Sequence, residues 1–227
     1  MRRSDARTVP FRRLVVALLL ATLMAAPALY AQDGPANAVS IDPLLIIFNM
    51  YRGTYELRVA DQFSAMADVA YSPNFFWGIH QYTKLTYLDL IGKGRYYVGS
   101  LLKDAADDIG NEKIRGYVGR AFTDALGGVF VGGFLGYVNS VVEQGAGADY
   151  FRADFNGFGG GLELGLKYIF GDSGLSFFAE PYVLLRYYAG GYAYRDESGV
   201  TIVKPEGFAD GFDRNGIAAG VNIGVSF

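Results

Sequence analysis

The most constraining feature of this chain is a two-residue alternation between apolar side chains and charged or small ones. In residues 150–170, leucines and aromatic residues at even positions stand opposite Glu163 and Lys167 at odd positions. Residues 175–195 repeat the pattern, with Glu180 and Arg186 opposite an apolar face. A period of two places successive side chains on opposite faces of a β-strand. The pattern therefore predicts long strands that have one apolar and one charged face.

The same alternation predicts eight strands in all. Turn residues separate them, with tight turns expected at 61–62 and 171–174. The upper end of segment 150–170 is out of phase with its lower end, which predicts a β-bulge near Gly157. The expected strands are 40–49, 54–60, 63–72, 82–99, 126–142, 150–170, 175–195 and 216–227.

Segment 100–125 breaks the pattern, because its apolar residues follow a helical period. We expect one or two amphipathic helices there, inserted between two strands. When strands are counted back from the C-terminus, this insert falls on the same side as the C-terminal end. The insert is therefore expected to be periplasmic if the strands form a barrel in an outer membrane, where periplasmic turns are normally short.

The charged faces carry five acidic and five basic residues, which we assign to one common surface. These residues are Glu56, Arg58, Asp68, Asp89, Lys93, Arg95, Glu163, Lys167, Glu180 and Arg186. Apolar bands about ten residues long, alternating with polar positions, are typical of a transmembrane barrel strand that faces lipid on one side. We therefore predict an all-β fold, an eight-stranded antiparallel up-and-down transmembrane β-barrel. A soluble β-sandwich with charged outer faces is the alternative.

An interior of eight strands is just wide enough for side chains to fill. The inward charges should therefore pair with one another as a packed ionic core. From the face assignment alone, Glu163 is expected to pair with Lys167 or Arg186. Such pairing is the ordinary filling of a small barrel and does not by itself indicate catalysis.

The N-terminal segment has the pattern of a secretory signal peptide. A basic stretch over 1–13 precedes an apolar run over 14–26, and small residues follow near Ala28 and Ala31. The apolar run is too short to span a bilayer. We expect residues 1–31 to be removed, residues 32–38 to be a flexible leader, and residues 39–227 to form the barrel domain in the outer membrane.

Composition excludes several partners. Without residues 1–31 the chain has 15 basic and 22 acidic residues, and no basic stripe suggests nucleic-acid binding. The absence of cysteine excludes disulfides and thiolate metal sites. We expect no cofactor and no metal, and outer-membrane lipid as the surrounding partner.

The whole chain after residue 31 resembles the small outer-membrane β-barrels of the OmpA-like and opacity-protein-like superfamily. The segments that carry the resemblance to an uncharacterised family of such barrels are DPLLIIF with GTYELRVADQFSAMADVAYSPN, then GKGRYYVG and FFAEPYVLLRYYAG. The terminal alternation of Val221, Ile223, Val225 and Phe227 resembles the C-terminal signal by which the barrel-assembly machinery recognises its substrates. The resemblance implies a fold and a location, and it implies no reaction.

No catalytic residue stands out. Lipid A deacylases resemble one another in a His-x-Ser pair. The single histidine of this chain, His80, has no serine two positions later and so does not match that pair. The GFGGG segment at 157–161 lies inside a strand, where glycine serves close packing and does not form a phosphate-binding loop. Phe75, Phe76 and Trp77 are expected in an interfacial aromatic belt.

Three functions remain open at this point. The first is a structural or surface-interaction barrel that presents loops 73–81, 143–149 and 196–214 outside the cell to an unknown ligand. The second is a narrow channel gated by the 100–125 insert. The third is a lipid A-modifying enzyme.

Overall fold

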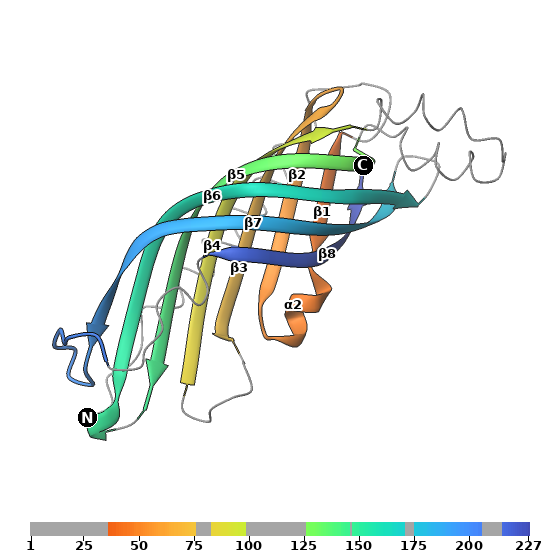
Figure 1. The fold of residues 1–227 in the computed structure, drawn as a ribbon. Coiled ribbons are helices and arrows are strands. Elements are labelled where there is room, and N and C mark those ends of the chain that lie inside the picture. Colours follow the sequence, from red (N-terminus) through yellow and green to blue (C-terminus); the bar gives the residue numbers. More distant parts are fainter. Residues whose placement is uncertain (1–35, 76–82, 99–125, 146, 171–174, 206–214) are drawn as a thin grey trace. The chain divides into compact units, whose positions relative to one another are not determined.

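Eight antiparallel strands form one closed barrel in the computed structural model, which describes residues 36–75, 83–98, 126–145, 147–170, 175–205 and 215–227 (Figure 1). The predicted eight-stranded up-and-down barrel is confirmed. The strands are β1 (Asn37–Ile41), β2 (Tyr51–Ala60), β3 (Phe63–Phe75), β4 (Thr83–Tyr97), β5 (Gly128–Gln144), β6 (Phe151–Phe170), β7 (Ser176–Arg195) and β8 (Gly216–Ser226). The predicted signal peptide, the 100–125 insert, Phe76, Trp77 and His80 lie outside the described residues.

Each strand pairs with the next along the chain, and β8 pairs with β1 to close the ring. Register shifts occur between Arg58 and Ala60 and between Ser72 and Phe75. The bulge predicted near Gly157 is wrong, because β6 keeps one register with β5 from Phe151 to Lys167. The strand does not change phase. Its outward face changes from apolar to polar near Asn156, and this change imitates a phase shift in the sequence.

The first strand is also shorter than predicted. Instead of one strand over 40–49, β1 ends at Ile41 and a short helix, α2 (Pro43–Ile47), follows. Asp42 caps this helix by accepting a hydrogen bond from the Leu44 amide at 3.0 Å, and Pro43 occupies the first helical position. Acidic N-caps followed by proline favour a helix start, and this local signal outweighs the apolar run after it. β1 also begins at Asn37, within the expected leader.

The barrel has a polar inside and an apolar outside. Large exposed apolar side chains lie on the outer face of the strands, including Leu135, Leu162 and Ile217. Aromatic pairs occur at both ends of this apolar band, with Phe63 packed on Tyr96 at one end and Tyr137 on Phe158 at the other. The band therefore has aromatic borders, and the charged side chains occupy the opposite face of the same strands.

The strands differ in length around the ring. β6 and β7 have 20 residues each and β5 has 17, whereas β2 has 10 and β8 has 11. Figure 1 shows the three long strands running side by side. We call the end that holds Asn37 and Phe227 the terminal end, and the opposite end the loop end. No helix in the described part of the chain is long and apolar enough to cross a membrane.

Candidate functional site

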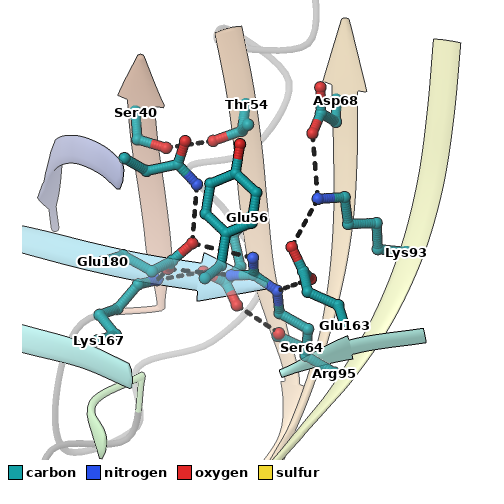
Figure 2. A network of polar contacts seen from close by, with 12 residues as sticks. Ser40, Thr54, Glu56, Ser64, Asp68, Lys93, Arg95, Glu163, Lys167 and Glu180 are labelled. Atoms are coloured by element: carbon teal, nitrogen blue, oxygen red, sulfur yellow. Dashed lines mark hydrogen bonds and ion pairs between the residues drawn. The ribbon is translucent and has the colours of Figure 1, made fainter. Parts of the chain in front are cut away.

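Four basic and four acidic side chains form a continuous ionic network in the barrel interior, and Figure 2 labels all of them except Arg52. They come from five different strands, and each is at most 5% exposed apart from Arg52 at 9%. Buried charges are tolerated only when paired and hydrogen-bonded. The eight residues are Arg52, Lys93, Arg95, Lys167, Glu56, Asp68, Glu163 and Glu180.

Arg95, on β4, is the centre of this network. Its two terminal nitrogens donate to both oxygens of Glu180, at 3.0 and 2.9 Å, and its Nε donates to Glu163 at 2.9 Å. The guanidinium lies 4.0 Å from the centroid of the Phe130 ring. One planar cation thus binds two carboxylates and an aromatic face, an arrangement that suits arginine and not lysine.

Glycine makes the contact between Arg95 and Glu163 possible. The strand between them, β5, places Gly132 opposite both residues. A Cβ at Gly132 would lie 3.2 Å from Cγ of Arg95 and 3.0 Å from the carbonyl oxygen of Gly94. Because Gly132 has no side chain, Arg95 can reach across β5 to Glu163. The expected pairing of Glu163 with Lys167 or Arg186 rests on strand faces alone and does not include this contact. That expected pairing is wrong.

Lys167 has different partners from those expected. Its Nζ contacts Glu56 closely and lies 3.4 Å from Glu180. The ammonium is also 4.4 Å from the centroid of the Phe178 ring. Glu56 accepts further hydrogen bonds from Ser64 and, at 2.7 Å, from the hydroxyl of Tyr97. The carboxylate of Glu56 is therefore fully occupied by protein donors.

The network continues through Lys93 towards α2. Nζ of Lys93 lies 2.8 Å from Glu163 and 3.1 Å from Asp68, and Asp68 pairs with Arg52 at 3.2 Å. Arg52 donates to the Tyr182 hydroxyl at 2.6 Å, and that hydroxyl donates to Asp42 at 3.0 Å. The helix cap is thus joined to the ionic interior.

Asp89, Arg58 and Arg186 lie apart from this network. Asp89 is buried and accepts hydrogen bonds from the hydroxyls of Tyr87, at 3.0 Å, and Tyr188, at 2.9 Å. Arg186 is half-buried and donates to the Tyr87 hydroxyl at 3.5 Å. Arg58 pairs with the exposed Asp61 at the terminal end, at 3.0 Å.

Arg52, and three polar side chains that bind the network, were not among the predicted residues. Arg52 falls between the expected strands 40–49 and 54–60, although it has the same parity as Glu56 and Arg58, and that parity places it on the inner face. Tyr97, Tyr182 and Asn222 supply hydroxyl and amide donors, and Asn222 donates to Glu180 at 2.8 Å. Tyrosine on an alternating strand carries no sequence signal that separates an inward donor from an outward aromatic anchor.

The predicted residues of the C-terminal segment lie on the outside. Ile223 on β8 and Phe227, the residue after β8, are exposed, and Val221 and Val225 share their parity. Phe75 is the last residue of β3, where its backbone pairs with Leu85. Among the described residues, no group of three or more His, Asp or Glu side chains is placed to hold a metal ion.

A closed eight-stranded barrel with an ionic interior and an apolar exterior is the class of protein that this fold and site define. No family model matches the chain, and no curated protein matches it. Among solved structures, the chain is similar to the crystal structure of CarO from Acinetobacter baumannii, with 10% sequence identity and a TM-score of 0.39. The match covers 87% of this chain and 99% of that one.

Proposed function

We propose that this protein is an outer-membrane β-barrel whose lumen is closed by the ionic network and whose role is structural or surface-interacting. The observation that carries the proposal is the polarity of the barrel, with apolar side chains outside and eight paired charges inside. In hydrocarbon, a closed barrel satisfies all its backbone hydrogen bonds internally. In water the same outer face would be a large exposed apolar surface.

The location follows from this proposal together with the predicted signal peptide. The terminal end would face the periplasm and the loop end the exterior, and Val221, Ile223, Val225 and Phe227 would bind the barrel-assembly machinery. Resemblance to OmpA-like and opacity-protein-like barrels supports the same assignment. Cell fractionation, with a comparison of boiled and unboiled samples on gels, tests it. We expect heat-modifiable migration in the outer-membrane fraction, and recovery in the soluble periplasm would overturn the proposal.

The packed interior supports this role over that of a channel. At the level of Arg95 and Lys167 these two side chains and the three carboxylates that bind them, Glu56, Glu163 and Glu180, are at most 3% exposed. Purified protein in planar bilayers should therefore show no steady ion conductance. As a matched comparison, Arg95→Ala combined with Lys167→Ala removes two central side chains and should produce a measurable current. Steady conductance by the unaltered protein would favour the channel function.

The proposed role includes no catalysis. The carboxylates of the network are held by protein donors, and the enzyme alternative depends on His80, outside the described residues. Mass spectrometry of lipid A from cells with and without the protein tests the enzyme alternative. We expect identical spectra, and a mass change that depends on the protein would show that it modifies lipid A.

A further inference from the structure

A row of outward-facing charges crosses four neighbouring strands near the loop end. Lys84 on β4 is the register partner of Glu143 on β5, which is the partner of Arg152 on β6, which is the partner of Arg195 on β7. Asp154 lies on the same outer face of β6, two residues from Arg152. We call these five residues the outer charged row. They play no part in the interior network, which lies on the other face of the strands.

The outer charged row lies beyond the apolar band. On β6 the band ends near Phe158, which packs against Tyr137, and the next outward residue, Asn156, accepts hydrogen bonds from Tyr137 and Asn139. Arg152 lies six residues beyond Phe158 along β6. For a tilted strand this places it about 15 Å above the aromatic pair of Tyr137 and Phe158. Long basic side chains can bend back by several ångströms towards a membrane. This height suits a lipid with a bulky headgroup.

The basic residues of the row are more accessible than the acidic ones. The side chains of Lys84, Arg195 and Arg152 are 56%, 48% and 39% exposed, whereas those of Glu143 and Asp154 are 28% and 12% exposed. A partner that approaches from the side of the barrel therefore meets mainly positive charge. The three bases also outnumber the two acids.

The pairs at the two ends of the row are loose. Lys84 lies 3.7 Å from Glu143, and Arg195 lies 3.6 Å from Asp154. Arg152, in contrast, is held by Asp154 at 2.8 Å. Arg152 thus fixes the centre of the row, while Lys84 and Arg195 keep donor capacity for an external anion.

We propose that the outer charged row binds the phosphate groups of a phosphorylated glycolipid in the surrounding leaflet. This inference depends on the proposed outer-membrane location. The described parts of the loops beyond the row carry three acidic residues, Asp149, Asp196 and Glu197, and one base, Lys204, so their net charge is negative and positive charge is concentrated at the level of the row. A lipid phosphate fits this arrangement because it reaches the row from below, along the outer face of the barrel.

The test compares lipid retention by the full-length protein in nonionic detergent, measured by native mass spectrometry. The probes are rough-type lipopolysaccharide with phosphorylated core sugars and the same material after chemical removal of phosphate. The double variant Lys84→Gln with Arg195→Gln should weaken binding of the phosphorylated probe by about tenfold, since each base near a charged lipid surface contributes to attraction. The loss should shrink as salt is added.

The matched control is Lys204→Gln, which removes an exposed base from the loop after β7 and should leave lipid retention unchanged. The single variants should each give part of the loss. The inference would be overturned if the double variant retained the phosphorylated probe as well as the unaltered protein does. It would also be overturned if the unaltered protein retained the phosphate-free probe as well as the phosphorylated one. Inorganic phosphate at millimolar concentration should not displace the lipid, and displacement would assign the row to free phosphate.

The failure of this inference can be told apart from failure of the proposed function. Heat-modifiable migration of each variant reports an intact barrel independently of lipid binding. Proteins that migrate as folded barrels but retain no phosphorylated glycolipid would contradict only the inference about the row. Recovery of the unaltered protein in the soluble periplasm would contradict the proposed location itself.

Discussion

Arg95 and Glu180 meet in a bidentate pair inside the barrel, with two parallel hydrogen bonds of 3.0 and 2.9 Å between strands that are not neighbours. In the ring, β5 and β6 separate β4 from β7, so this pair joins two strands that share no backbone hydrogen bonds. Because Arg95 also binds Glu163, one side chain connects three strands. Removing it would leave Glu180 without its bidentate partner and Glu163 with Lys93 as its remaining cation.

Arg95→Leu should therefore destabilise the folded barrel by about 3–5 kcal/mol, the usual result of breaking a buried ion pair on one side. Urea titration in detergent micelles, followed by intrinsic fluorescence, measures the change. Lys84→Gln serves as the control, since its pair is exposed and should contribute about 1 kcal/mol or less. Equal unfolding midpoints for the two variants would show that the network does not stabilise the barrel.

Two glycines offer a test of the packed interior. A Cβ at Gly161 would lie 2.6 and 2.7 Å from atoms of the Phe134 ring and closer still to the Leu185 carbonyl oxygen. A Cβ at Gly191 would meet no atom within 4 Å. Gly161→Ala should cost about 1–3 kcal/mol or prevent assembly, whereas Gly191→Ala should be neutral or slightly stabilising. Refolding yield on unboiled gels compares them, and a loss at Gly191 alone would contradict the packing.

The class of fold could be predicted from the sequence because apolar and polar residues alternate with a period of two along the strands. Glu163 and Lys167 appear on one face and Leu162 and Leu164 on the other without any knowledge of the structure. The end of β1 was not accessible, because its apolar run continues through α2. There the local cap of Asp42 and Pro43 decides the structure, although the hydrophobic pattern favours a longer strand.

Pairing within the network could not be predicted, since it depends on register between strands that are far apart in sequence. Glu163 and Lys167 share a strand, yet each binds partners from other strands. The register of β5 with β4 and β6 places Gly132, which has no side chain, between Arg95 and Glu163. Assigning residues to the inner or outer face does not show which residues of neighbouring strands lie side by side. Sequence alternation therefore predicts which residues are inside, but the sum of all strand registers decides which of them touch.

The outer face should be sensitive to charge in a way that depends on depth. Leu164 lies exposed in the middle of the apolar band on β6, so under the proposed location Leu164→Arg should cost about 2–4 kcal/mol in a bilayer. Val203 is even more exposed but lies in the loop after β7, and Val203→Arg should be neutral. Folding titrations in lipid vesicles measure both, and equal effects would remove the support for a lipid-facing band.

The last residue of the chain has two separable roles. The Phe227 carbonyl accepts hydrogen bonds from the amides of Ala36, at 3.1 Å, and Asn37, at 3.0 Å, and its own amide donates to Asn37 at 2.9 Å. These bonds belong to the backbone and close the ring between β8 and β1. The side chain, in contrast, is exposed and carries the predicted insertion signal.

Phe227→Ala keeps these backbone bonds and removes only the aromatic ring, whereas deletion of Phe227 removes both. The substitution should slow assembly in cells while changing the stability of the purified barrel by less than about 1 kcal/mol, because the ring is already exposed in the folded state. Deletion should impair assembly and also lower stability, since buried backbone groups lose their partners. Assembly is measured by the appearance of heat-modifiable protein after induction, and stability by urea titration. Normal assembly of Phe227→Ala would show that the terminal ring is not a recognition signal, and unchanged stability after deletion would show that the seam does not depend on this residue.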